Sequence, residues 1–154
     1  MYSYSKIIKK LLKKNISVST VESCTGGLLS SKFTSFAGIS KIYNMGLITY
    51  SNQSKIKLLK INKKILNKHG AVSFQIALLM VKNLKKISHS KLCISTTGIA
   101  GPSGGSKKKP VGLIFIGIYY KNSIKIFEKK YTGSRKQIQN KTIKFIFNII
   151  SQLI

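Results

Sequence analysis

The chain has 154 residues, 43% of them hydrophobic, and its 28 lysine and arginine residues against two acids give a net charge of +26. This hydrophobic content argues against a disordered chain, and no apolar run approaches the roughly 18 residues that a membrane-spanning helix needs. Lysines interrupt the apolar residues near the N-terminus, so we predict no signal peptide. We expect a single domain over residues 1–154, in the cytoplasm and without a membrane partner.

The positive charge raises the question of a nucleic-acid partner. However, the lysines occur in nearly every segment, and Arg135 is the only arginine, although arginine is the preferred bidentate partner of phosphates and bases. Lysine, isoleucine, asparagine and serine are abundant together, as strong A+T bias in a genome would produce. We therefore attribute the charge to drift in surface composition and do not expect nucleic acid as a partner.

The first half of the chain alternates between predicted helices and strands. In chain order these are a helix at about 3–14, a strand at about 16–21, a helix ending near 36, a strand at 43–50, a helix capped by Ser51 or Asn52, and a short helix at about 62–68. His69-Gly70 is typical of a helix end.

In the second half, Ser73 is predicted to cap a helix. The buried stripe of that helix is predicted to comprise Phe74, Ala77, Leu78, Val81 and Leu84. The run 92–97 is continuously apolar and β-branched, as in a strand buried on both faces. Residues 111–120 and 124–131 are predicted to form a hairpin, and Ser134 to cap the last helix.

This order of elements predicts an α/β fold. We expect a three-layer domain with a mixed, mostly parallel sheet, an antiparallel hairpin near the C-terminus, and helices on both faces. Open α/β sheets bind ligands beyond the carboxyl ends of their strands. Four segments are therefore candidates for a site, namely 22–27, 49–55, 97–106 and 132–135.

The reactive side chains in the sequence restrict the types of catalytic site that it can form. Neither His69 nor His89 stands beside a serine in these segments, which argues against a Ser-His-Asp triad. Cys24 and Cys93 form neither a disulfide framework nor a metal motif, and no phosphate-loop pattern is present. A serine nucleophile with a neutral lysine as its base is the arrangement that the sequence allows best, with purely architectural glycine turns as the alternative.

Five motifs in order closely resemble the CinA C-terminal family of nicotinamide-nucleotide amidases (nicotinamide mononucleotide deamidases). They are Val21–Gly27 (VESCTGG), Gly46–Asn52 (GLITYSN) with Lys55, His69–Ser73 (HGAVS), Thr97–Gly105 (TGIAGPSGG) and Lys109–Gly112 (KPVG). The match extends over about residues 4–153. Larger family members carry an extra N-terminal domain, and this chain resembles the stand-alone amidase.

The resemblance implies hydrolysis of nicotinamide mononucleotide to nicotinate mononucleotide and ammonia, in pyridine-nucleotide salvage. It implies Ser23 as the nucleophile and Lys55 as its base. No metal or organic cofactor is implied, and the small-molecule nucleotide is the expected partner besides other copies of the chain in a homo-oligomer, at least a dimer. A family member that binds the nucleotide without turnover is the alternative.

Two further residues are expected in the catalytic group. Tyr50 can orient Lys55 or donate to the substrate, with core packing as an equal alternative. Thr97 can bond Lys55 or the oxyanion, with a loop cap as the alternative. Cys24 is a rival nucleophile, because a thiol at a helix N-terminus becomes acidic.

Substrate contacts are expected mainly from the two glycine-containing loops, where backbone amides are accessible. The expected substrate-binding residues are Glu22, Cys24, Thr25, Gly26, Gly27, Asn52, Gly98, Gly101, Gly104, Gly105, Ser106 and Arg135. The Thr25 amide is a candidate for the oxyanion hole, and Arg135 for the phosphate. For Glu22 we favour a structural or orienting role over proton transfer. The family commonly has more basic residues where this chain has Gln137, Gln139 and Asn140.

Overall fold

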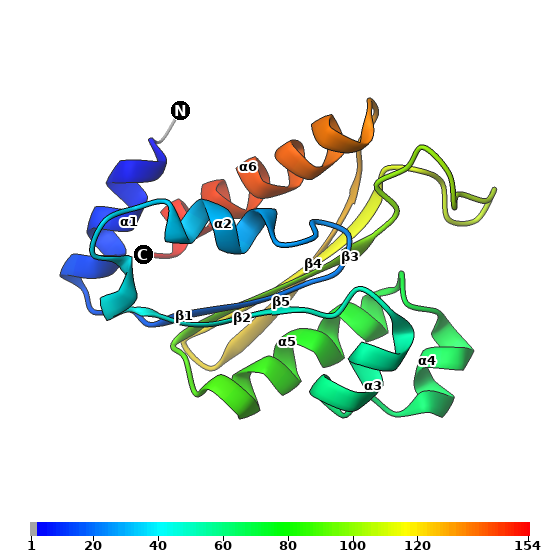
Figure 1. Ribbon diagram of the computed structural model, residues 1–154, viewed down its shortest axis with the longest axis horizontal. Helices are drawn as coiled ribbons and strands as arrows, with labels where there is room; N and C mark the ends of the chain where they lie inside the picture. Colours follow the sequence, from blue (N-terminus) through cyan, green and yellow to red (C-terminus); the bar gives the residue numbers. More distant parts are fainter. Residues whose placement is uncertain (1–2) are drawn as a thin grey trace.

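The computed structural model describes residues 3–154, which form a five-stranded sheet between two layers of helices (Figure 1). The strands are β1 (Val18–Glu22), β2 (Tyr43–Ile48), β3 (Leu92–Gly98), β4 (Leu113–Tyr120) and β5 (Ser123–Lys130). Their order in the sheet is β2-β1-β3-β4-β5. Strand β1 pairs in parallel with β2 and β3, and β4 pairs antiparallel with β3 and β5. The predicted fold class is confirmed.

The strands' burial follows from their position in the sheet. Every residue of β1 is buried, as are the first six of β3, because helices cover both faces of these central strands. Strands β2 and β5 form the two edges and show alternating burial instead. The β4–β5 turn consists of Lys121 and Asn122, both with positive φ, so the hairpin connection is one residue shorter than predicted.

The helices divide evenly between the two faces of the sheet (Figure 1). One layer contains α1 (Tyr4–Lys13), α2 (Leu28–Thr34) and α6 (Arg135–Leu153). The other contains α3 (Asn52–Leu59), α4 (Lys63–His69) and α5 (Phe74–Ser88). No helix in residues 3–154 is long and apolar enough to cross a membrane.

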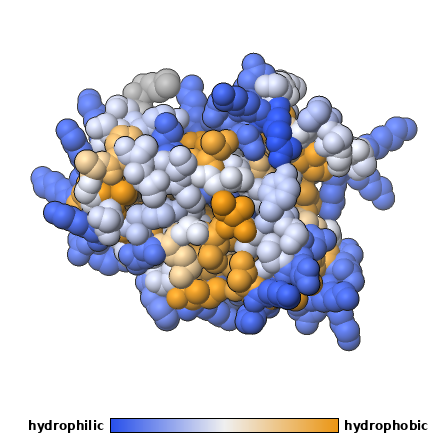
Figure 2. Space-filling view, viewed as in Figure 1, coloured by the Kyte–Doolittle hydropathy of each residue, from blue (hydrophilic) through white to orange (hydrophobic). Residues whose placement is uncertain are grey.

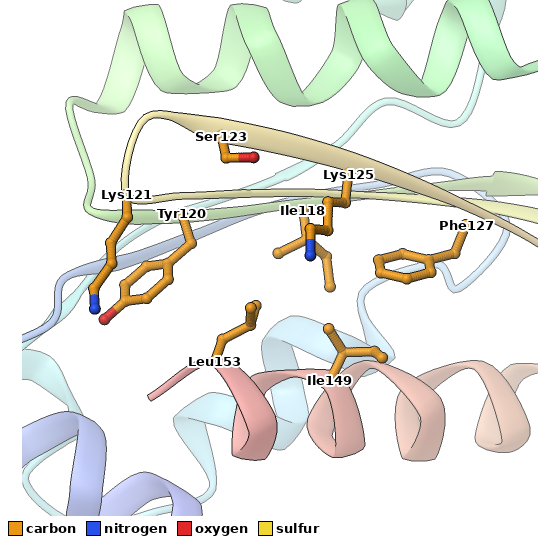
Figure 3. Close-up of a pocket in the computed structure, with 8 residues that line it drawn as sticks. All are labelled: Ile118, Tyr120, Lys121, Ser123, Lys125, Phe127, Ile149 and Leu153. Atoms are coloured by element: carbon orange, nitrogen blue, oxygen red, sulfur yellow. The ribbon is translucent and has the colours of Figure 1, made fainter.

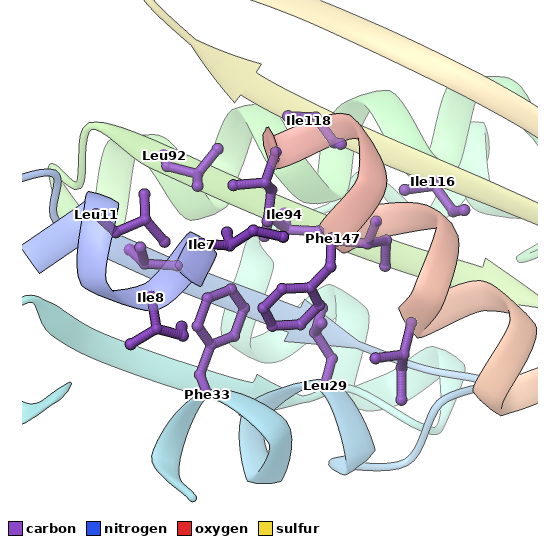
Figure 4. Packing of buried hydrophobic residues seen from close by; sticks show 14 of the residues in the cluster. Ile7, Ile8, Leu11, Leu29, Phe33, Leu92, Ile94, Ile116, Ile118 and Phe147 are labelled. Atoms are coloured by element: carbon purple, nitrogen blue, oxygen red, sulfur yellow. The ribbon is translucent and has the colours of Figure 1, made fainter. Parts of the chain in front are cut away.

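The larger of the two main apolar cores lies between the sheet and the α1, α2 and α6 layer (Figure 4). At its centre the rings of Phe33 and Phe147 lie 4.9 Å apart, so α2 and α6 contact each other above β1. On the opposite face, α5 presents Ile76, Met80 and Leu84 to the sheet. Phe74, predicted as buried, is 49% exposed because it is the first residue of the helix and faces away from the sheet.

Three loops gather beyond the carboxyl ends of β1, β2 and β3, at the right of Figure 1. Residues 23–27 follow β1, residues 49–51 follow β2, and the long segment 99–112 follows β3 and projects from the body of the molecule. The parallel arrangement of these three strands therefore brings three of the four candidate segments to one edge.

Candidate functional site

The turn after β1 carries the candidate nucleophile. Ser23 is 8% exposed, and its backbone amide donates to the Thr96 carbonyl of β3 at 2.9 Å. Gly26 and Gly27 have positive φ values of 58° and 97°, which lets the chain reverse before α2. The helix begins at Leu28 with Gly27 as its N-cap residue, so Cys24 lies in the turn before the helix and not at the expected helix N-terminus.

Glu22 explains why this turn is ordered. Its buried carboxylate accepts hydrogen bonds from the backbone amides of Gly27, Leu29 and Ser30 at 2.8–3.0 Å, and from the hydroxyls of Thr25 and Ser30 at 2.6 Å. The carboxylate thus satisfies the exposed amides at the start of α2 and interacts with the positive helix end. This arrangement favours the orienting role expected for Glu22.

The candidate base comes from the helix after β2. Ser51 caps α3 by accepting a hydrogen bond from the Ser54 amide at 3.0 Å, which places Lys55 one turn into the helix with its side chain directed inward. Lys55 is 1% exposed. Its Nζ lies 3.0 Å from Ser23 Oγ, 2.6 Å from the Thr49 carbonyl and 3.5 Å from the Tyr50 carbonyl.

Burial lowers the pKa of Lys55 from 10.5 to about 8, because the charged ammonium is poorly solvated there. A neutral amine has two hydrogens and one lone pair. The two carbonyls can accept only hydrogens, so they orient both N–H groups away from Ser23. The remaining lone pair then faces the Ser23 hydroxyl, as a proton acceptor must.

The rival nucleophile is not activated. Burial raises the pKa of the Cys24 thiol to about 12, whereas a nucleophilic cysteine needs a lowered pKa. Cys24 follows Ser23 in the turn, but its side chain packs into the apolar core. Ser23 is therefore the better nucleophile of the two.

Two backbone amides beside Ser23, those of Cys24 and Thr25, donate no backbone hydrogen bond to the described residues. Gly26 donates to the Ser23 carbonyl and Leu28 to the Thr25 carbonyl, and the Gly27 amide is bound to Glu22. Within residues 3–154, neither of these two amides donates to another residue. Unpaired amides next to a nucleophile can stabilise an oxyanion.

A cavity of about 210 Å³ opens at this position. The residues that line it are Ser23, Cys24, Tyr50, Lys55, Ala71, Val72, Thr97, Gly98, Ala100 and Arg135. Seven of these belong to the sequence-predicted set. Ala71, Val72 and Ala100 were missed because aliphatic side chains carry no chemical signature, although all three lie inside the motifs that resemble the family.

Arg135 joins the loops at the rim of the cavity. Its guanidinium donates to the Gly101 carbonyl at 2.8 Å and to the Tyr50 hydroxyl at 2.6 Å. Tyr50 is 59% exposed, so packing in a core does not account for it. The Thr97 hydroxyl donates to the Ala71 carbonyl at 2.7 Å, so it is engaged with the cavity wall rather than with Lys55.

The other predicted substrate-binding residues lie outside the cavity lining. Asn52 is exposed at the start of α3, and Gly104, Gly105 and Ser106 lie on the projecting segment. The Ser106 hydroxyl accepts a hydrogen bond from the Lys109 amide, which closes a local turn. Contacts from this segment to a substrate remain a prediction.

Gln139 also holds the turn that carries Ser23, and nothing in the sequence predicted this contact except that Gln139 departs from the family pattern. The Gln139 side-chain amide on α6 donates to the Cys24 carbonyl at 2.9 Å. Gln139 thus links α6 to the turn that carries the nucleophile.

A second cavity, of about 240 Å³, lies between the β4–β5 hairpin and the end of α6 (Figure 3). Its walls are mainly apolar, with Ile118, Phe127, Ile149 and Leu153 facing one another. No nucleophile in this cavity is hydrogen-bonded to a base. It is therefore a weaker candidate for a catalytic site than the cavity beside Ser23.

The family model described as "CinA C-terminal domain" matches residues 3–154. The chain belongs to this family. A relative from Clostridium botulinum (strain Loch Maree / Type A3), provisionally named a competence-damage inducible protein, is 47% identical over 137 residues. A relative of the same name from Caldicellulosiruptor bescii is 44% identical over 148 residues.

These matches cover 89% and 96% of the chain but only 34% and 36% of the relatives. The chain thus spans about a third of the length of the curated relatives it matches. The names of these relatives describe inducibility and state no reaction. They therefore support the family and leave the activity of the site to be argued from its geometry.

Solved structures of CinA proteins have the same fold. Competence/damage inducible protein CihA from Agrobacterium tumefaciens has a TM-score of 0.93 at 35% identity, covering 97% of this chain and 92% of that one. A CinA superfamily protein from Escherichia coli has a TM-score of 0.92 at 26% identity, covering 98% and 88%. The five-stranded sheet and its helical layers are therefore the CinA fold.

Proposed function

We propose that this CinA domain is an amidohydrolase that converts nicotinamide mononucleotide to nicotinate mononucleotide and ammonia. The observation that carries the proposal is the buried pair of Lys55 and Ser23, with 3.0 Å between Nζ and Oγ and a lowered pKa on the lysine. The substrate comes from the resemblance of the five motifs to nicotinamide-nucleotide amidases.

In the first half-reaction Ser23 Oγ attacks the carboxamide carbon while its proton passes to Lys55 Nζ. The amides of Cys24 and Thr25 receive the developing oxyanion. Lys55, now an ammonium, returns the proton to the amide nitrogen as the carbon–nitrogen bond breaks. Ammonia leaves, and the acyl group stays on Ser23 as an ester.

In the second half-reaction water attacks the ester carbon, with neutral Lys55 accepting its proton. The same two amides hold the second oxyanion. Collapse of this intermediate breaks the bond to Ser23 Oγ, which recovers its proton from Lys55, and the carboxylate product leaves. Lys55 thus begins and ends the cycle uncharged, as its lowered pKa favours.

The surroundings of the dyad suit a mononucleotide. The cavity of about 210 Å³ gives the pyridine carboxamide an enclosed position beside Ser23. Arg135 stands at its rim, where a planar guanidinium can bind phosphate oxygens in a bidentate manner. The net charge of +26 also favours the approach of an anionic substrate.

The test is ammonia release from nicotinamide mononucleotide. Ser23→Ala and Lys55→Met are expected to lose activity by at least about 10²-fold, because each removes one partner of the proton transfer. Lys57→Met, an exposed lysine on the same helix, is the matched control and should keep wild-type activity. A wild-type protein that binds the nucleotide without releasing ammonia would contradict the proposal and favour a binding role.

A further inference from the structure

The last turns of α6 and the edge strand β5 enclose a cavity of about 240 Å³ (Figure 3). It lies at the far end of the sheet from Ser23, because the end of β4 that lines it pairs with the beginning of β3. Along α6 alone, about 21 Å separate Ile149 at this cavity from Arg135 at the other. The cavity is therefore distinct from the proposed active site.

The side chains of β5 explain why this space is open. They alternate between the two faces of the sheet, and Ser123, Lys125 and Phe127 are those that face α6. Phe127 packs edge-on against Phe145 of α6, with 5.4 Å between the ring centroids, which closes the gap at that level. Beyond this contact, β5 presents only a serine and a lysine to Ile149. Serine is too small to fill the gap, and lysine extends its charged end towards water, so a cavity remains.

The cavity combines an apolar wall with a cationic rim. Ile118 of β4 completes the wall, and the charged residues of the lining are Lys121 and Lys125, both exposed. Among the described residues that line it, none is an acid. Glu128 belongs to the opposite face of β5, where it pairs with Lys130. The electrostatic potential at this rim therefore favours an anion.

Lysines occur throughout the chain, and hydrophilic side chains surround the face seen in Figure 2, so a lysine beside a cavity is not sufficient evidence of a site. In the neighbouring cavity, of about 490 Å³, Lys85 and Lys91 already donate to backbone carbonyls at 2.9–3.2 Å. Within residues 3–154, neither Lys121 nor Lys125 donates a hydrogen bond or forms an ion pair. Their charges are therefore available to a ligand.

We propose that this cavity binds a medium-chain carboxylate, with the alkyl chain against the apolar wall and the carboxylate beside Lys121 and Lys125. The proposal is independent of the enzymatic one. A small inorganic anion would leave the apolar wall in contact with water, and an uncharged hydrocarbon would leave both ammonium groups without a partner. An amphiphilic anion satisfies both parts of the cavity.

The volume of the cavity sets the length of the chain. At roughly 30 Å³ for a group of the size of a water molecule, about 240 Å³ accommodates about eight such groups. Octanoate matches this length. Burial of one methylene group changes a dissociation constant about 4-fold, so hexanoate is expected to bind about 15-fold more weakly than octanoate. Octanol lacks the attraction to the two lysines and is expected to bind about 5-fold more weakly.

The experiment is a titration of isotope-labelled protein with octanoate, followed by NMR. Chemical shifts are expected to change at Ile118, Phe127, Ile149 and Leu153, and to saturate at one equivalent with a dissociation constant of about 1 mM or lower. The signals of Ser23 should stay in place, because that residue lies at the other end of the sheet. Hexanoate and octanol are titrated in the same way.

Three variants separate the charge from the apolar wall. Lys125→Met keeps an unbranched side chain but removes the charge, so octanoate should bind about 5-fold more weakly while octanol binds as before. Lys129→Met is the matched control, because the ammonium of Lys129 lies 4.3 Å from the ring centroid of Phe145, outside the cavity lining. It should bind octanoate like wild type. Leu153→Trp fills the cavity from the end of α6 and should weaken both ligands at least about 10-fold.

Three results would overturn the proposal. The first is a set of shifts that does not saturate or that spreads over the lysine-rich surface, as non-specific anion binding would produce. The second is an affinity for octanoate that Lys125→Met leaves unchanged. The third is octanol binding as tightly as octanoate, which would assign the cavity to an uncharged apolar group.

Discussion

Lys55 and Ser23 meet because the chain places each of them just beyond the end of a strand. Ser23 follows β1, and Lys55 lies one helical turn after β2, its parallel neighbour. Local sequence predicts the two strand ends, and the motif resemblance names both residues. The distance between them follows from the pairing of β1 with β2, which no local pattern in the sequence specifies.

Cys24, the residue next to Ser23, provides a second test of the site. Its pKa is raised by burial, so it should neither attack a substrate nor react readily with alkylating reagents. Cys24→Ala is expected to retain activity within about 3-fold, because only a small buried group is lost. The comparison is with Ser23→Ala under the same ammonia assay. Loss of activity in Cys24→Ala with survival in Ser23→Ala would reverse the assignment of the nucleophile.

At the scale of elements, α2 depends on an acid outside it. The helix has seven residues and no side-chain cap at Gly27, and Glu22 supplies the missing acceptors from β1. The sequence favours a structural or orienting role for Glu22, but it also predicts Cys24 at the helix N-terminus, whereas the helix begins four residues later at Leu28. The reason is that the cap comes from the preceding strand, whereas cap rules consider residues at the helix start.

Replacing Glu22 tests this dependence. In Glu22→Gln, the NH2 group of the new side chain faces backbone N–H groups. Both are hydrogen-bond donors, so hydrogen bonds are lost there. The negative charge that stabilises the helix end is lost as well. We expect the free energy of unfolding to fall by about 2–3 kcal/mol, measured by urea denaturation, and the turnover number to fall with it.

The other acid of the chain is the matched control for that experiment. Glu128 is exposed on β5 and contacts only Lys130, at 3.7 Å, so Glu128→Gln should change stability by less than about 0.5 kcal/mol. Equal stability of the two variants would show that the Glu22 carboxylate does not organise α2.

Other helices show which features the hydrophobic periodicity of the sequence predicts correctly and which it does not. Ser51, Ser73 and Ser134 cap their helices as predicted, because a hydroxyl before an apolar-periodic segment satisfies the first free amides. The stripe of α5 was misplaced at Phe74, since an apolar residue in the first turn can face solvent without breaking the period. The motif resemblance, rather than periodicity, located most of the cavity lining.

At the scale of the whole molecule, charge is the main unusual feature. Within residues 3–154 the single salt bridge joins Glu128 to Lys130, so the other lysines are not neutralised by acids. A net charge of +26 destabilises the compact state through self-repulsion, which salt screens. The fold tolerates this charge because the lysines lie mainly on the outer faces of the two helical layers.

This repulsion makes stability depend on salt. We expect the melting temperature to rise on the order of 5 °C between 50 mM and 500 mM sodium chloride, as measured by calorimetry. Lys57→Met removes one exposed positive charge and should raise the melting temperature only slightly at each salt concentration. A melting temperature that falls with salt would indicate that specific ion pairs outweigh the repulsion.

In the proposed mechanism an uncharged Lys55 accepts the proton of Ser23, and this step can be followed in the pH dependence of kcat/KM for nicotinamide mononucleotide. Because burial lowers the pKa of Lys55 to about 8, the fraction of neutral amine rises through that pH. We expect kcat/KM to increase from pH 6 and to level off above about pH 9, with one ionisation near 8. In Lys55→Met the residual rate should lack this ionisation, whereas Lys57→Met should reproduce the wild-type curve. A wild-type rate that is flat across this range, or that falls as pH rises, would contradict it.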